Sequence, residues 1–269
     1  MIKQLVLGGL SSIILASATP LLAVPTPPTN WTGFYAGVNA GGATGHSSLK
    51  TSITNDDYFA VSSAASVQSS ADHNVSPSGF IGGGQIGYNY QAGHGVYGIE
   101  GDFDALNLSA SSSNSALYPD YAPAGYTINE SVKTNWLATV RPKLGWAQKN
   151  TLLYVTGGFA FTDIKVGGSF SDDYVIGDGG LAAHTVYSGE ATESASTTKQ
   201  KSGYALGFGG SYALQNNWSL SAEYIYVDFG RVTTSGILTW PPEPATTSQL
   251  NHSADLSANI FRLALNYKF

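Results

Sequence analysis

The sequence predicts an all-β fold, an eight-stranded antiparallel up-and-down transmembrane β-barrel, and three observations carry the prediction. The last nine residues, 261–269, alternate large apolar side chains with polar or small ones and end on Phe269. Eight segments in all have this two-residue period, and the connections between them alternate short with long. Charged residues make up only 11% of the chain, yet beyond the amino terminus no apolar run reaches the roughly 18 residues of a membrane helix.

The amino terminus predicts an exported protein. A single lysine precedes an apolar stretch and then small residues, which is typical of a secretory signal. We therefore assign residues 1–23 to a signal peptide, 24–32 to a periplasmic leader and 33–269 to the barrel. The small-residue pattern permits cleavage after Ala18 or Ala23 and does not choose between them. An uncleaved anchor helix is the alternative, although the apolar stretch is short for a membrane span.

The first three predicted strands alternate clearly. They run from about Gly33 to Gly45, Gly79 to Gln91 and Val96 to Ala110. In the first, Phe34 and Val38 share one face while Tyr35 and Asn39 take the other. The second and third form a tight hairpin, and one face of the third is acidic.

The other five predicted strands follow the same rule. They run from about Val132 to Ala147, Leu152 to Gly168, Lys201 to Leu214, Trp218 to Val232 and Ser253 to Phe269. Pro142 weakens the first of these, because proline cannot donate to the ladder. In the third, small residues alternate with aromatic or aliphatic ones, so one face is nearly bare.

The connections predict which way the barrel faces. Short turns lie at Ala92–Gly95, Gln148–Asn150 and Gln215–Asn217, whereas long loops such as Ser47–Ser78 and Ser169–Gln200 join the other strands. Outer-membrane barrels carry short turns on the periplasmic side and long loops outside. We therefore expect both chain ends on the periplasmic side.

The ionisable residues of the strands lie opposite the aromatic face. In a soluble β-sandwich the aromatic face would be the core, whereas in a barrel it meets lipid and the polar face lines the lumen. The predicted lumen charge network comprises Glu100, Asp102, Asp104, Arg141, Lys143, Glu223 and Arg262. Distances from the turns place Glu100 near Arg141 and Glu223 near Arg262, so we expect two cross-strand pairs. An ion path or a catalytic carboxylate dyad is the functional alternative to this buried salt-bridge network.

The sequence lacks the residues that several other classes of function require. A net charge of −6 without a basic cluster argues against nucleic acid, and the absence of cysteine removes thiol chemistry. No phosphate loop, metal-ligand spacing or nucleophile elbow is in a fitting context, so we predict no enzyme activity and no cofactor.

Histidines 46, 73, 184 and 252 lie in or beside predicted loops and His94 lies in a turn. A loop histidine could ligate haem iron beside an apolar slot, and His252 with a nearby carboxylate could serve a lipid hydrolase.

Five stretches resemble one known family, the porin-like outer-membrane β-barrel proteins that are abundant in alphaproteobacteria. They are Asn30–Gly42 (NWTGFYAGVNAGG), Gly82–Asn89, Leu153–Ala160, Gly203–Gly210 and Ala222–Gly230. The resemblance implies an eight-stranded barrel similar in architecture to the OmpA membrane domain. Some relatives are hemin-binding surface proteins, which keeps the histidines of interest.

The resulting functional prediction is a structural surface protein of the outer membrane, with a lumen plugged by charges and long extracellular loops for surface interactions. A narrow porin and a haem-binding receptor are the alternatives. Expected partners are outer-membrane lipid and lipopolysaccharide, the barrel-assembly machinery through Phe269, and host or surface ligands through the loops. Nucleic acid is not expected.

Overall fold

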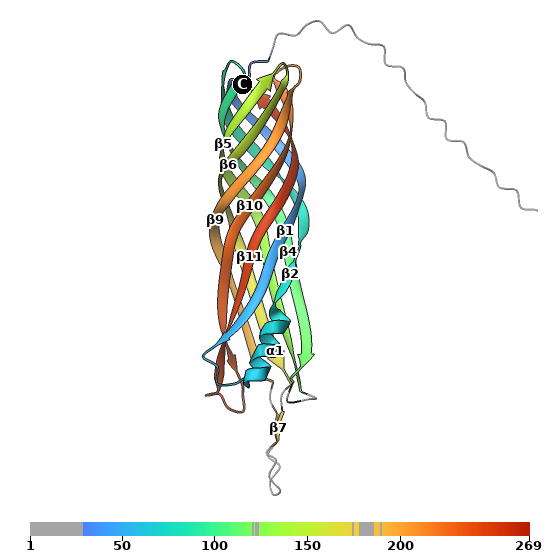
Figure 1. The fold of residues 1–269 in the computed structure, drawn as a ribbon, viewed down its shortest axis with the longest axis vertical. Helices are drawn as coiled ribbons and strands as arrows, with labels where there is room; N and C mark the ends of the chain where they lie inside the picture. Colours follow the sequence, from blue (N-terminus) through green and yellow to red (C-terminus); the bar gives the residue numbers. More distant parts are fainter. Residues whose placement is uncertain (1–28, 120, 122–123, 174, 178–185, 189) are drawn as a thin grey trace, which may run out of the picture.

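A computed structural model describes residues 29–119, 121, 124–173, 175–177, 186–188 and 190–269. The predicted signal peptide and most of the predicted leader lie outside these residues. Figure 1 shows long strands inclined around a common axis, with the C-terminus at one end and helix α1 at the other. No helix in the described part of the chain is both long and apolar enough to cross a membrane.

The described elements are one helix and eleven strands. Eight strands are long: β1 (Gly33–Thr54), β3 (Ser78–Ala92), β4 (Gly95–Leu117), β5 (Gly125–Gln148), β6 (Thr151–Asp172), β9 (Thr192–Ala213), β10 (Trp218–Thr239) and β11 (Thr247–Lys268). The others are short: α1 (Val61–Ala71), β2 (His73–Val75), β7 (Val175–Gly177) and β8 (Val186–Ser188).

The main sheet is antiparallel and closes on itself. Its order is β11-β10-β9-β6-β5-β4-β3-β1-β2, and β1 also pairs with β11 along almost its whole length. The predicted count of eight strands is wrong, because the sheet contains nine. The ninth is the three-residue β2, which pairs with Ser47–Leu49 of β1 inside a segment predicted to be a loop.

The strands are longer than predicted. β1 continues to Thr54, and β6 and β9 extend to Asp172 and back to Thr192, well into the predicted loops. The cause is visible in β11, where the apolar positions change phase between Ile260, which points inward, and Phe261, which points outward. Beyond that point polar residues face out and apolar residues face in, as in a soluble barrel. The outward apolar pattern stops at this change of phase, and the predicted strands end several residues beyond it, at Ser253 in β11 and at Gly168 in β6.

Three tight turns join the strands at the end that we call the turn end, as predicted. They contain residues at positive φ, namely Gly93, Lys149, Asn216 and Asn217. Asparagine and glycine tolerate this left-handed conformation better than most residues, and positive φ permits the two-residue connections at 93–94 and 149–150 and the four-residue connection at 214–217. The opposite end, which carries α1, is the loop end.

An apolar band encircles the half of the sheet nearer the turn end. Its members are large side chains that point outward and stay exposed, for example Phe34, Ile99, Leu144, Phe159, Phe208 and Leu263. Aromatic residues such as Trp146 and Trp218 lie at its turn-end margin. Toward the loop end the outward residues become mainly Ser, Thr, Asn and Lys. A surface this apolar is stable in hydrocarbon rather than in water.

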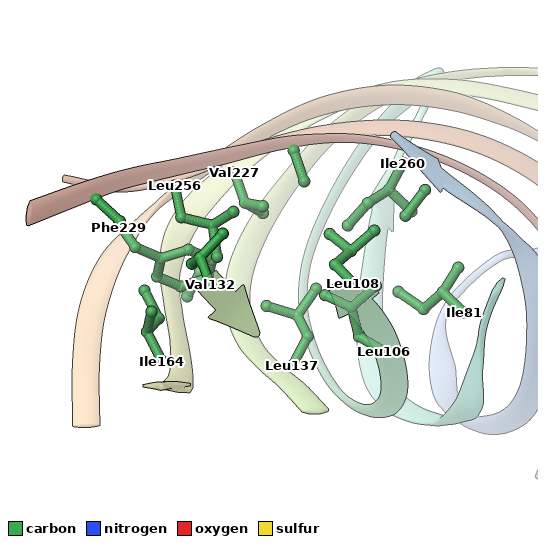
Figure 2. Packing of buried hydrophobic residues seen from close by; sticks show 14 of the residues in the cluster. Ile81, Leu106, Leu108, Val132, Leu137, Ile164, Val227, Phe229, Leu256 and Ile260 are labelled. Atoms are coloured by element: carbon green, nitrogen blue, oxygen red, sulfur yellow. The ribbon is translucent and has the colours of Figure 1, made fainter. Parts of the chain in front are cut away.

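The interior is layered along the axis. Nearest the turn end a small apolar cluster includes Trp31 and Leu152, and the charged residues lie above it. A larger apolar cluster, shown in Figure 2, fills the next level with residues such as Leu106, Leu137 and Ile260. A third apolar cluster at the loop end includes Val67 of α1. The inside is therefore packed with side chains along most of its length.

The wall is irregular in two places in its loop-end half. β3 ends at Ser78 while its neighbours continue, and α1 and β2 lie beside that shortened edge and contact β1 and β4. Between β9 and β10 the ladder is interrupted from Asp228 to Thr239, where a bulge contains Gly230 at φ +63°. Lys199 of β9 reaches across this gap and donates to the carbonyl oxygen of Thr233 at 3.3 Å.

Candidate functional site: the charged cluster inside the sheet

All seven residues of the predicted charge network point into the interior and form one cluster. Three acids come from β4, two cations from β5, Glu223 from β10 and Arg262 from β11. Residues two apart share a face of a strand, so Glu100, Asp102 and Asp104 form an acidic column. Arg141 and Lys143 form a basic column on the neighbouring strand, and the two columns face each other.

The register places both expected pairs opposite one another. Glu100 is the cross-strand partner of Arg141, and Glu223 is the partner of Arg262. The contacts extend beyond these pairs, because each guanidinium bonds several carboxylates. Such charge-assisted hydrogen bonds are stronger than neutral ones and fix the planar guanidinium groups in place.

Arg141 connects three acids. Its Nη2 atom lies 3.0 Å from Glu100 Oε1 and 2.9 Å from Asp102 Oδ2, while Nη1 lies 3.1 Å from Glu223 Oε1. Its Nε donates to Thr139 Oγ1 at 2.8 Å, and that hydroxyl donates in turn to Asp102 at 2.6 Å. Arg141 has no exposed surface. Its charge is therefore balanced entirely by protein groups.

Arg262 bonds two of these acids, and also Asp104, from the other side of the interior. Its Nη2 lies 2.8 Å from Glu223 Oε2 and 3.2 Å from Asp102 Oδ2, and Nη1 lies 2.8 Å from Asp104 Oδ2. In the ring of eight long strands, β11 and β5 stand four places apart, so the two arginines come from opposite walls. Both bond Glu223 and Asp102, which makes the network continuous across the interior.

Lys143 completes the cluster toward the turn end. Its ammonium lies 2.8 Å from Glu100 Oε2 and 4.2 Å from the centre of the Tyr154 ring. The Tyr35 hydroxyl accepts from Lys143 at 3.2 Å and donates to Glu100 at 2.6 Å. Aromatic rings attract cations over their faces, so Tyr154 adds a partner that carries no charge.

Several uncharged polar residues belong to the site although they were given no role from the sequence. Asn39 donates to Asp104 at 2.8 Å, and Gln85 donates to Asn266 at 2.8 Å. The available signal was the alternation itself, since these amides occupy inward positions at the height of the charged columns. The Asn39 amide thereby satisfies part of the hydrogen-bonding capacity of the Asp104 carboxylate.

Glycine makes room for the long side chains. A Cβ at Gly41 would collide with the backbone and Cβ of Arg262, and one at Gly87 would collide with the Tyr35 ring. Packing therefore explains why the inner face of the glycine-rich strands carries so few side chains. It leaves space for arginine and tyrosine in a sheet whose eight long strands enclose little volume.

The cluster holds four acids and three cations, all buried. Removing this many charges from water is costly unless each is paired, and every charged group here has an opposite charge within 4 Å. The arrangement suits a closed electrostatic plug. Within the described residues, no group of three or more His, Cys, Asp or Glu side chains is arranged to hold a metal ion.

A second polar cluster, not expected from the sequence, lies between the two larger apolar clusters. His252 Nε2 lies 3.0 Å from Glu193 Oε2, and Nδ1 lies 2.7 Å from Thr51 Oγ1, which donates to Glu130 at 2.7 Å. Burial alone would lower the pKa of His252, but hydrogen bonds and charge from Glu130 and Glu193 raise it to about 9. The imidazole is therefore a cation at neutral pH.

The histidines do not gather into one site in the described residues. His46 lies in β1, His73 in β2 and His94 in a turn, while His184 lies outside the described residues. His252, expected beside a loop, lies within β11 and is 1% exposed. With both ring nitrogens engaged, it is placed to hold an ion pair rather than to activate a nucleophile.

Comparison with known proteins gives consistent matches. The model of the outer membrane protein β-barrel domain family matches residues 13–269. The 31 kDa outer-membrane immunogenic protein of Brucella melitensis is 31% identical over 261 residues, covering 96% of this chain and 92% of that protein. A 22 kDa outer membrane protein of Rhizobium leguminosarum is 30% identical over 149 residues, covering 55% and 52%.

One solved structure illustrates how far the structural likeness reaches. The outer membrane protein OprG from Pseudomonas aeruginosa aligns over 88% of this chain and 97% of its own, with 11% identity and a TM-score of 0.39. That likeness is too distant to support an argument about function.

Proposed function

Because the chain belongs to the outer membrane protein β-barrel family and resides in the outer membrane, we propose that it is a structural surface protein with a sealed lumen. In this proposal the eight long strands form an up-and-down transmembrane barrel, and β2 is a local addition to its wall. The apolar band lies in the bilayer, the turn end faces the periplasm, and the loop end stands above the outer surface.

The cross-lumen contacts of the two arginines carry the proposal. Arg141 and Arg262 come from opposite walls and meet on the same carboxylates, so their side chains occupy the axis of the barrel at mid-membrane height. An eight-stranded barrel is only just wide enough for its own side chains. A hydrated path past two fixed guanidinium groups would need the network to open.

The apolar layers support the same conclusion. Trp31 and its neighbours lie below the charges, and the large apolar cluster lies above them. Moving an ion through such a layer without hydration would be strongly unfavourable. The narrow porin is therefore the weaker alternative.

The haem receptor and the lipid hydrolase find less support. A haem receptor needs a histidine beside an accessible apolar slot, whereas His252 is buried in an ion-paired cluster. For the same reason we propose no catalytic role, since a substrate could not reach that imidazole. Surface interactions are assigned instead to the exposed outer wall and the connections of the loop end.

The proposed partners follow from this placement. The apolar band would contact outer-membrane lipid, with lipopolysaccharide in the outer leaflet. Phe269 is 75% exposed: its amide bonds the Phe34 carbonyl at 3.0 Å and its ring packs edge-on against Tyr267, which leaves most of the side chain accessible to the assembly machinery. Host or surface ligands would meet the loop end.

Single-channel recording tests the sealed lumen. The mature chain is refolded into planar bilayers and compared with the double variant Arg141→Ala/Arg262→Ala and with Lys149→Ala, which alters an exposed cation in a turn. We expect no current steps from the parent or from Lys149→Ala. The double variant should also stay silent at low voltage, because the apolar layer above the charges remains.

Regular current steps from the parent would contradict the proposal and favour the porin. Current from the double variant but not from the parent would mean that the charged cluster seals the lumen and that the apolar layer does not seal it unaided. Insertion is checked in each case by protease protection of the band, so that silence is not mistaken for failure to insert.

A further inference from the structure

Two lysines face each other on the outer wall just beyond the apolar band. Lys133 of β5 is the direct cross-strand partner of Lys165 of β6, and both side chains are exposed. Like charges placed directly opposite in a sheet repel and destabilise it. Neither ammonium has an ion-pair or hydrogen-bond partner among the described residues.

Other outward cations of the loop-end half are neutralised differently. Lys50 pairs with Asp72 at 3.3 Å, and Arg231 pairs with Asp255 at 3.1 Å. Lys133 and Lys165 differ from these two outward cations in having no acidic partner among the described residues. The chain has a net charge of −6, so a general need for positive charge does not account for them.

Hydroxyl groups extend the lysine pair on both sides. The register continues from Ser109 of β4 through Lys133 and Lys165 to Thr198 of β9, so four neighbouring strands each contribute one donor to a single cross-strand row. We call Ser109, Lys133, Lys165 and Thr198 the donor row. Adjacent strands lie about 4.8 Å apart, so the row spans roughly 14 Å. Ammonium and hydroxyl groups in line are suited to phosphate oxygens.

The height of the row matches the headgroup region. The last band residue on β6 is Phe161, which precedes Lys165 by four positions on the same face. At about 3.3 Å per residue Lys165 lies about 13 Å along the strand from Phe161, or about 10 Å above the band once the strand tilt is included. Lysine side chains near a membrane turn their charged ends toward the interface.

Asp163 and Trp136 lie between the row and the band. The Trp136 indole donates to Asp163 Oδ2 at 3.2 Å and stacks on Phe103, as expected for a residue at the interface. Asp163 has the wrong charge for an anion site. Its carboxylate should therefore weaken the binding of phosphate. Replacing Asp163 with a neutral residue should strengthen that binding, which is the opposite effect to replacing the lysines.

We propose that the donor row binds the phosphate groups of the phosphorylated glycolipid in the outer leaflet, with Lys133 and Lys165 as the charged contacts. The bound lipid would relieve the repulsion between the two lysines and hold β5, β6 and the adjoining strands at a set depth. This inference rests on the proposed membrane placement and adds a specific lipid site to it.

Lipid retention by native mass spectrometry tests the site. The mature chain is refolded in micelles with lipid A, or with the same lipid A after enzymatic removal of its phosphates. We expect the parent to retain the phosphorylated form more tightly. Each lysine should contribute about fivefold, which corresponds to about 1 kcal/mol for a cation near an anionic surface. Lys133→Gln/Lys165→Gln should therefore lose about 25-fold.

Control variants distinguish binding at the donor row from a general effect of the protein's charge. Lys149→Gln removes an exposed cation at the turn end and should leave retention unchanged, while Asp163→Asn should increase it. All replaced side chains lie on the outer surface, so folding should persist, and the heat-dependent mobility of the folded barrel in gels checks this.

The outcomes are distinguishable. Equal retention of phosphorylated lipid A by the parent and the double variant overturns the site, as does full competition by inorganic phosphate, which would indicate a free-anion site. Failure of the folded parent to retain either lipid form overturns the site as well, whereas failure of the parent to fold in micelles would contradict the membrane placement and hence the proposed function. A loss confined to the double variant and to the phosphorylated lipid supports the site.

Discussion

Replacing Arg262 with alanine should destabilise the folded barrel severely. The guanidinium is 1% exposed and has four carboxylates within 4 Å. Its removal leaves four acids facing only Arg141 and Lys143, so the formal charge of the cluster changes from −1 to −2 in a buried layer. Removing one partner from a buried ion pair costs about 3–5 kcal/mol. We expect a loss in that range in the free energy of unfolding.

The exposed pair on the outer wall supplies a matched control. Arg231 also bonds an aspartate through two nitrogens, at 3.1 Å each, but its side chain is 59% exposed. Exposed ion pairs contribute about 0–1 kcal/mol. Arg231→Ala should therefore cost far less than Arg262→Ala, although both changes remove an arginine from an aspartate.

Urea unfolding in lipid vesicles, followed by tryptophan fluorescence, measures both losses. A compensated variant, Arg262→Met with Glu223→Gln, returns the formal charge to −1 and should recover part of the loss, since the two sites are coupled. A cost of Arg262→Ala no greater than that of Arg231→Ala would refute the role of the buried pairs. A compensated variant less stable than Arg262→Ala alone would refute it as well.

Three further changes test other layers. The pKa of His252 in the folded protein is about 9, above the ordinary value of 6.5. The protonated imidazole therefore stabilises the fold fully below pH 6.5, and this stabilisation is lost as pH rises through 9. His252→Asn should abolish the resulting change of about 3 kcal/mol in the unfolding free energy between these pH values. Trp31→Ala should cost about 3 kcal/mol in urea unfolding by emptying the turn-end cluster, and an unchanged midpoint would refute this packing role. Phe208→Arg in the apolar band should cost about 2–4 kcal/mol, whereas Ser111→Arg on the polar outer wall should cost less than about 0.5 kcal/mol; equal costs would contradict the membrane placement.

The sequence was most informative where one rule governed a whole segment. Two-residue alternation points all four residues inward, and similar counts from the turn end place Glu100 opposite Arg141 and Glu223 opposite Arg262. Counting residues from a common end of the sheet is enough to align two neighbouring strands, even though β4–β5 and β10–β11 are joined at the loop end. It says nothing of contacts across the interior, so the meeting of Arg141 and Arg262 on shared carboxylates was not foreseen.

Strand ends and the His252 cluster were missed for one physical reason. Glu130, Glu193 and His252 occupy inward positions in stretches where Ser and Thr face outward. Such stretches have the composition of loops, although a continuous inward pattern of apolar and paired polar residues runs through them. β2 and α1 are short and polar, and they form beside the edge that the early end of β3 leaves uncovered. Their presence depends on that tertiary context.

The change of apolar phase within a strand leaves a recognisable mark. Where the wall leaves the band, the last outward apolar residue lies next to the first inward one, as Ile260 and Phe261 do in β11 and Ala160 and Phe161 do in β6. Both strands continue without a break in their alternation, so it is the outward side chains that change from apolar to polar and not the strand. In the proposed membrane placement, adjacent apolar residues mark the height of the membrane surface. Lys165 lies four residues beyond this mark on β6, which is why a headgroup site is expected there.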